Sequence, residues 1–181
     1  MMDTETDTAR REVPLRVMRI RHFVIALAVF TLDQLTKGWV EKMRGHASIE
    51  VIPNLFSIVH LENHGAAFGL FQDSPSQWKV GLLIAFSLLA LAVVVILLWR
   101  GRNPGATGVA LALIMGGACG NLFDRLLHGS VVDFLLFYVS RYEWPAFNVA
   151  DSAIVVGAGL LVWDILRSEP QPAREAVAGQ Q

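Results

Sequence analysis

Residues 80–99 read VGLLIAFSLLALAVVVILLW, a run of twenty residues without a charged side chain. A helix of this length crosses about 30 Å of hydrocarbon, so the run is typical of a transmembrane helix. The whole chain fits this interpretation, because 54% of its 181 residues are hydrophobic and only 17% are charged. An ordinary soluble domain has about a quarter of its residues charged. The sequence therefore predicts an integral membrane protein and excludes a disordered chain.

Three further stretches are long enough to span a bilayer. Residues 106–123 are uncharged up to Phe123 and rich in glycine and alanine, which let helices pack closely in lipid. Residues 23–40 and 146–163 are apolar but contain several polar side chains. Within residues 23–40, the apolar run is followed by DQLTK and not by a small-residue cleavage site. This argues against a secretory signal peptide. We expect an all-α integral membrane protein with four transmembrane helices, forming one domain over residues 1–181.

Arginines indicate the orientation of these spans, because positive charge is enriched on the cytoplasmic side. Both termini are therefore predicted to be cytoplasmic, with residues 1–14 and 168–181 as mobile tails. Residues 41–78 and 125–145 are then exported loops. The arginines that carry this argument precede the first span, separate the second from the third, or follow the fourth: Arg10, Arg11, Arg16, Arg19, Arg21, Arg100, Arg102, Arg167 and Arg174.

The exported loop 41–78 is predicted to contain structure of its own. Its stretch ASIEVIPNLFSIVHLEN is rich in Ile, Val and Phe, and Pro53-Asn54 interrupts it as a turn. We expect a small extracytoplasmic β-cradle here. The following GAAFGLF (residues 65–71) predicts a short interfacial helix.

Several kinds of chemistry find little support in the sequence. A net charge of −1 argues against a nucleic-acid-binding protein, and the single Cys119 excludes an intrachain disulfide. The five histidines lack the paired spacing of a zinc helix. We therefore expect no metal and no cofactor.

Four aspartates stand out against this apolar background: Asp33, Asp124, Asp133 and Asp151. Ionisable residues at membrane depth are costly, so each is a candidate functional residue. The predicted topology brings all four towards the exported ends of their segments. The sequence therefore predicts one shared polar site, built from distant parts of the chain.

Two of these aspartates have cations near them in sequence. Asp33 and Lys37 lie four residues apart, so they share a helix face and are predicted to form an ion pair that orients the first helix. Asp124 precedes Arg125 in GNLFDR and is interpreted as its anchor. Arg125 could instead bind a substrate group, and both alternatives stay open.

Asp133 and Asp151 have no adjacent cation in sequence. Two carboxyl groups close together can share one proton, so that one activates water while the other protonates. The structural alternative is that these regions only cap secondary structure. Asp133 would then cap a turn, and Asn148 would be the N-cap of the last helix.

Five motifs together resemble the bacterial lipoprotein signal peptidase family, signal peptidase II. They are LDQLTK (32–37), NHGAAFG (63–69), GGACGNLFDR (116–125), VVDF (131–134) and FNVAD (147–151). The resemblance covers residues 20–166, and their order and spacing fit. It implies a four-helix membrane aspartyl protease in the bacterial inner membrane, with its site near the extracytoplasmic face.

The resemblance also assigns roles to individual residues. Asp133 and Asp151 become the catalytic pair. The implied substrate- and inhibitor-binding residues are Asn63, Gly65, Asn121, Arg125 and Asn148, and the implied structural residues are Asp33, Lys37 and Asp124. The implied partners are a diacylglyceryl-modified prolipoprotein, cut before its lipidated cysteine, membrane lipid, and globomycin-type inhibitors, with the enzyme a monomer.

Two other functions remain as alternatives at this stage. A proton-coupled membrane carrier could use the same carboxylates as a relay, although four spans without an internal repeat are few for a carrier. A structural assembly factor could use the polar residues only to hold helices together. The clustering of the carboxylates on one side argues against the carrier, and the lack of adjacent cations beside Asp133 and Asp151 argues against the assembly factor.

Overall fold

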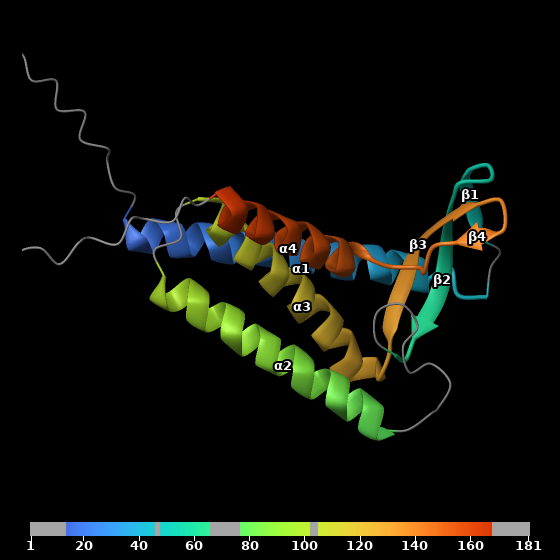
Figure 1. Ribbon diagram of the computed structural model, residues 1–181. Coiled ribbons are helices and arrows are strands. Elements are labelled where there is room, and N and C mark those ends of the chain that lie inside the picture. Colours follow the sequence, from blue (N-terminus) through green and yellow to red (C-terminus); the bar gives the residue numbers. More distant parts are fainter. Residues whose placement is uncertain (1–13, 46–47, 66–76, 102–104, 168–181) are drawn as a thin grey trace, which may run out of the picture.

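The computed structural model describes residues 14–45, 48–65, 77–101 and 105–167. Its helices form a bundle with a small sheet at one end, and the first residues of α1 and the last of α4 lie at the opposite end (Figure 1). The predicted helical architecture with a small sheet is confirmed. The elements in chain order are α1 (Leu15–Glu41), β1 (Ile49–Ile52), β2 (Phe56–Asn63), α2 (Gln77–Arg100), α3 (Ala106–His128), β3 (Val131–Val139), β4 (Tyr142–Glu143) and α4 (Val149–Arg167).

Helix α3 contacts each of the other three helices. Its glycines make this possible, because a Cβ atom at Gly116 would lie 2.6 Å from the carbonyl oxygen of Ala26 in α1. A Cβ atom at Gly117 would likewise collide with the carbonyl oxygen of Ala150 in α4. The prediction that small residues of this helix allow close packing is confirmed.

Three helices in the described part of the chain are long and apolar enough to cross a membrane: Trp78–Arg100, Ala106–His128 and Val149–Arg167. Helix α1 is long enough, but it carries five charged side chains between Arg16 and Lys37 that make it less apolar. Helix α2 exposes large apolar side chains such as Phe86 and Leu89, at 70% and 62%. An exposed apolar surface of this extent is suited to lipid.

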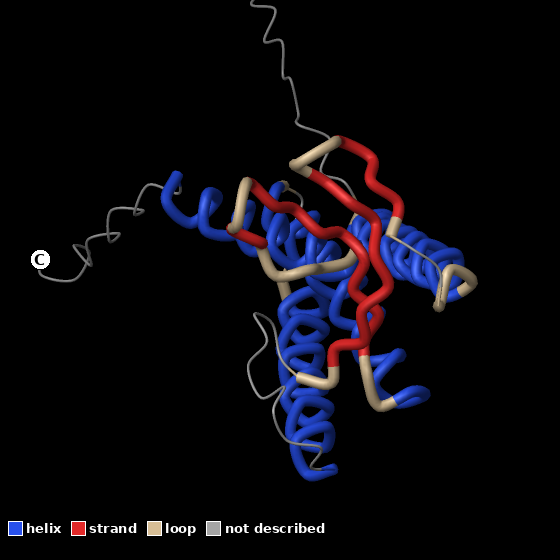
Figure 2. The backbone as a smooth tube through the Cα atoms, turned by 90° about the vertical axis from the view of Figure 1, so that its right-hand side faces the viewer, coloured by secondary structure: helices blue, strands red, loops and turns tan. Residues whose placement is uncertain are grey.

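The four strands form one antiparallel sheet in the order β1-β2-β3-β4, which lies across one end of the helices (Figure 2). Strands β1 and β2 confirm the strands predicted within residues 41–78, and Asn54 occupies the predicted turn at φ 60°. Strand β3 lies within residues 125–145, where the sequence predicts an exported loop and no strand. Its sequence VVDFLLFYV is rich in β-branched and aromatic residues, and it pairs with β2.

The helix ends also differ from the predicted spans. Helix α4 begins at Val149 and not at Ala146, because Phe147 still pairs with Leu135 as an isolated bridge. Helix α3 continues to His128 and ends at Gly129, whose φ of 73° favours glycine. The predicted tails, apart from Pro14, and the GAAFGLF segment, apart from Gly65, lie outside the described residues.

Candidate active site

The polar site lies where β3 approaches the first turn of α4, at the sheet end of the bundle (Figure 1). Asp133 comes from β3 and Asp151 from α4, while Asn121 comes from α3. Asn148 is fully buried, and Asp133 is 4% exposed. Segments far apart in the sequence thus meet in one buried cluster.

Asn148 connects the two aspartates. Its Nδ2 donates to Oδ1 of Asp133 at 2.7 Å, and its backbone N–H donates to Oδ2 of Asp151 at 3.3 Å. In return, the backbone N–H of Asp151 donates to Oδ1 of Asn148 at 2.9 Å. This reciprocal pair is a capping box, so the prediction that Asn148 caps the last helix is confirmed. The interpretation of Asp133 as a turn cap is wrong, because Asp133 lies within strand β3.

Asn121 approaches Asp151 from α3. Its Nδ2 donates to Oδ1 of Asp151 at 2.7 Å, while its Oδ1 accepts hydrogen bonds from Nζ of Lys37 at 2.9 Å and Nδ2 of Asn148 at 3.2 Å. An ammonium group can only donate, so Lys37 determines which end of the Asn121 amide faces it. The amide N–H2 group is therefore directed at Asp151.

Lys37 is the centre of an adjoining charged cluster. Its Nζ lies 2.8 Å from Oδ2 of Asp33 and 2.7 Å from Oδ2 of Asp124, and all three side chains are almost fully buried. The predicted Asp33–Lys37 ion pair is confirmed. The interpretation of Asp124 as the anchor of Arg125 is wrong, because neighbouring residues on a helix do not face each other. Asp124 instead accepts from Nε2 of Gln34 at 3.0 Å as well as pairing with Lys37.

This charged cluster also holds the start of α4. Oδ1 of Asp33 accepts a hydrogen bond from the backbone N–H of Ala150 at 2.9 Å, and Nε2 of Gln34 donates to Oδ2 of Asp33 at 3.1 Å. Asp33 therefore fixes the position of the residue that precedes Asp151. The sequence interpretation missed the role of Gln34, although a polar residue beside Asp33 in an apolar stretch was a signal for it.

Asn63, Gly65 and Arg125 flank Asp133 on another side. Nδ2 of Asn63 donates to Oδ2 of Asp133 at 2.9 Å, and the backbone N–H of Gly65 donates to Oδ1 of Asn63 at 2.9 Å. Nη2 of Arg125 donates to the carbonyl oxygen of Gly65 at 3.2 Å. Leu61 of β2 lies opposite Asp133, so Asn63 occupies the diagonal position on the same face. The strand pairing, which the sequence did not reveal, brings these residues together.

The two aspartates differ from Asp33 and Asp124 in their partners. Among the described residues, neither Asp133 nor Asp151 forms an ion pair with lysine or arginine. Burial raises the pKa of Asp133 to about 6, and the nearby charge of Asp151 adds to this, although hydrogen bonds from Asn63 and Asn148 act in the opposite direction. Asp133 can therefore gain and lose a proton close to neutral pH.

The site offers two carboxyl groups surrounded by amide and guanidinium donors. Within the part of the chain that the structure describes, no three His, Cys, Asp or Glu side chains are placed to hold a metal ion. Carboxyl groups that exchange protons near neutral pH can act as general acid and general base. The arrangement is therefore suited to hydrolysis by an activated water molecule.

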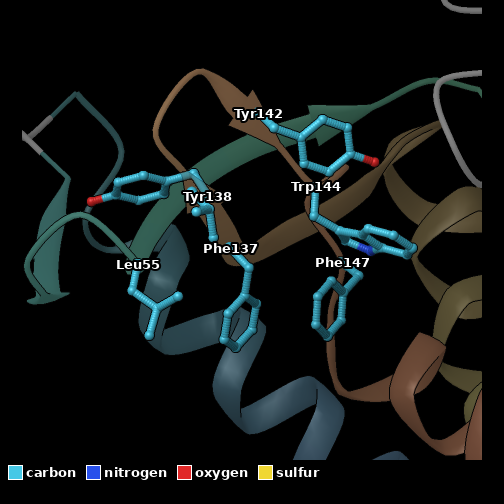
Figure 3. A pocket seen from close by; sticks show the side chains of 7 residues that line it. Leu55, Phe137, Tyr138, Tyr142, Trp144 and Phe147 are labelled. Atoms are coloured by element: carbon cyan, nitrogen blue, oxygen red, sulfur yellow. The ribbon is translucent and has the colours of Figure 1, made fainter.

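An apolar recess of about 410 Å³ lies on the sheet, separate from the carboxylates (Figure 3). Phe137 stacks on Phe56 and on Phe147, with ring centroids 4.7 and 6.0 Å apart. Phe147 immediately precedes Asn148, so the recess adjoins the site without containing its reactive groups. The side chains that Figure 3 labels in it are Leu55, Phe137, Tyr138, Tyr142, Trp144 and Phe147.

Comparisons with known proteins agree with this picture. Residues 25–167 match the family model described as signal peptidase (SPase) II. A lipoprotein signal peptidase of Solibacter usitatus is 44% identical over 158 residues, which cover 86% of this chain and 96% of that protein. One from Paraburkholderia phymatum is 46% identical over 143 residues, covering 79% and 86%. A solved structure described as a bacterial membrane enzyme, determined by the in meso method at 1.9 Å resolution, is 32% identical with a TM-score of 0.71, covering 82% of this chain and 94% of that one.

Proposed function

Because the chain belongs to the signal peptidase II family, we propose that it removes signal peptides from bacterial prolipoproteins with Asp133 and Asp151 as its catalytic pair. The observation that supports this pair is that both aspartates share Asn148 as a hydrogen-bond partner. Asn148 bonds to both carboxylates, and among the described residues no lysine or arginine forms an ion pair with either. Asp33 and Asp124, in contrast, both form ion pairs with Lys37. We assign these three residues to structural support.

In the proposed reaction, one carboxylate takes a proton from water while the resulting hydroxide adds to the scissile carbonyl carbon. The other carboxyl group, in its protonated form, stabilises the new oxyanion and then supplies the proton that the departing amine needs. The C–N bond breaks, and the two products leave as a carboxylic acid and an amine. The raised pKa of Asp133 suits this exchange, because it lowers the cost of moving a proton near neutral pH.

The substrate must present an extended peptide to these groups, because a helix would hide the scissile amide. Asn63, Gly65, Asn121, Arg125 and Asn148 are proposed to bind it, since they offer donors and acceptors close to Asp133 and Asp151. Freed backbone groups at membrane depth need such partners. We assign the same residues to the binding of globomycin-type inhibitors.

The membrane arrangement follows from the charges at the two ends of the bundle. Four spanning helices in a monomeric chain, with both termini cytoplasmic, would place the sheet and the site near the extracytoplasmic face of the inner membrane. A substrate whose cysteine carries a diacylglyceryl group could then reach the site sideways from the bilayer. The carrier function finds no support in the family, and the carboxylates gather near one end of the bundle and do not form a path across it.

The substrate assignment is tested with synthetic prolipoprotein peptides that differ only in the diacylglyceryl group on the cysteine. The purified full chain is incubated with each peptide, and the products are identified by mass spectrometry. We expect cleavage immediately before the lipidated cysteine and little cleavage of the unmodified peptide. Equal cleavage of both peptides would contradict the lipid requirement, and an uncut lipidated peptide would contradict the proposed function.

A further inference from the structure

A second groove, of about 350 Å³, lies among α1, α2 and α3 at the end of the bundle remote from the sheet. Apolar side chains from all three helices line it, among them Phe23, Val95, Leu98 and Met115. Nothing in the reaction described above uses this groove. Its volume is within the range of small-molecule binding sites.

Arg19 stands at the rim of the groove in a defined position. Its guanidinium carbon lies 4.5 Å from the centroid of the Trp99 ring, and its Nη2 donates to the carbonyl oxygen of Trp99 at 3.0 Å. The two contacts join α1 to the last turn of α2. A guanidinium carries five N–H donors, so the bond to Trp99 leaves it able to bind a phosphate as well.

Among the described residues of α1 and α2, the charged side chains at this end are all basic. Arg16, Arg21 and Arg100 lie in the same turns of α1 and α2 as Arg19 and Trp99. Helix α2 contains no aspartate or glutamate, and in α1 the first acidic residue is Asp33, near the other end of the bundle. The rim is therefore complementary to an anion.

The groove continues from this charged rim along the apolar surface of the bundle. Phe23 lies one turn further along α1 than Arg19, about 6 Å at the rise of an α-helix, and Val95 lies one turn before Trp99 in α2. A ligand that fills the groove must then have an anionic head and an apolar tail. A small soluble anion would leave the apolar walls uncovered.

We propose that this groove binds an anionic phospholipid of the adjacent leaflet, with the headgroup phosphate on Arg19 and an acyl chain along Phe23 and Val95. Basic pockets between membrane helices are suited to anionic headgroups, to which each basic residue contributes attraction. The bound lipid covers the gap between α1 and α2. It joins two helices whose contacts otherwise run mainly through α3.

Native mass spectrometry of the purified full chain tests this proposal. The protein is mixed with equal amounts of dioleoylphosphatidylglycerol and dioleoylphosphatidylcholine, which have the same acyl chains. We expect the wild type to retain phosphatidylglycerol preferentially, and Arg19→Gln to lose that preference by about fivefold. Arg167→Gln is the matched control, because Arg167 lies over Trp163 at 4.0 Å at the same end of the bundle but outside the groove.

A second variant tests the apolar part of the groove without changing its charge. Val95 is 43% exposed, so Val95→Trp should fill the groove from its open side and reduce retention of both lipids while the protein stays folded. Excess inorganic phosphate should not displace the retained lipid. Equal retention of the two lipids by the wild type would overturn the proposal. It would also be overturned by an equal loss in Arg167→Gln, by full retention in Val95→Trp, or by displacement with phosphate.

Discussion

The side-chain nitrogen of Asn148 donates a 2.7 Å hydrogen bond to the carboxylate of Asp133, while its side-chain oxygen accepts a hydrogen bond from the backbone N–H of Asp151 and so caps the helix that carries Asp151. One residue thus positions both members of the proposed catalytic pair. Its two roles use different atoms, because the cap needs only the side-chain oxygen. They can therefore be separated by substitution.

Asn148→Ser should keep the cap and remove the donor to Asp133, since serine is as good an N-cap as asparagine. Because serine also removes the buried amide donor, we expect Asn148→Ser to be less stable than the wild type but more stable than Asn148→Ala, while kcat falls by about tenfold or more. Asn148→Ala should lose the cap as well, at a cost of about 1 kcal/mol. Thermal unfolding in detergent and the peptide cleavage assay measure the two effects. Equal activity in Asn148→Ser and the wild type would contradict the role given to the amide.

The pH dependence of cleavage follows from the raised pKa of Asp133, about 6. If the ionised form takes the proton from water, kcat/KM should rise with pH through this region, with an apparent pKa that belongs to the Asp133–Asp151 pair. Asn63→Ala removes a hydrogen bond that favours the charged form of Asp133. The acidic limb of the pH–rate profile should therefore move to higher pH. A shift to lower pH would show that Asn63 does not stabilise the ionised carboxylate.

Lys37→Met should destabilise the protein strongly, because Asp33 and Asp124 would be left buried without their cation. Breaking a buried ion pair in this way costs about 3–5 kcal/mol. Arg44→Met is the matched control, since Arg44 pairs with Glu41 and Glu62 at solvent-accessible positions, where each such pair contributes about 1 kcal/mol or less. Denaturation in mixed micelles should separate the two variants clearly. Similar small losses in both would mean that the charged cluster does not hold the helices together.

Gly120→Ala tests the close packing of α3 against the charged cluster. A Cβ atom at Gly120 would lie 2.5 Å from Oδ2 of Asp33, so the carboxylate would have to move away from Lys37 and Ala150. We expect a loss of about 1–3 kcal/mol, typical of overpacking. Gly159→Ala, where no atom lies within 4 Å of the added Cβ, should be neutral or slightly stabilising. Thermal unfolding of both variants checks this, and equal stability would argue against the tight contact.

Local patterns in the sequence predicted much of this molecule. Long apolar runs located the four helices, and the spacing of Asp33 and Lys37 predicted their ion pair. The position of Asn148 before an apolar stretch predicted its cap. These features depend on residues within one or two turns of each other, which is why the sequence alone reveals them.

The errors concern contacts between distant segments. The sequence suggests Arg125 as the partner of Asp124, but the packing of α3 on α1 brings Lys37 to it. Strand β3 falls in a predicted exported loop, although its β-branched and aromatic residues favour a strand, because its partner β2 is far away in sequence. The meeting of Asn63 with Asp133 depends on that same pairing. Tertiary packing and strand register decide such contacts, and neither is visible in a single sequence.

Cleavage of a lipidated prolipoprotein peptide by Asp133→Asn and Asp151→Asn tests the catalytic pair most directly. Asparagine keeps the shape of the side chain but cannot take up or release a proton under these conditions. We predict that each variant folds, as judged by thermal unfolding in detergent, and that its kcat is lower by about 100-fold or more. Asp164→Asn is the control, because Asp164 lies in α4 towards the opposite end of the bundle. Normal cleavage by a folded Asp133→Asn or Asp151→Asn variant would contradict the account.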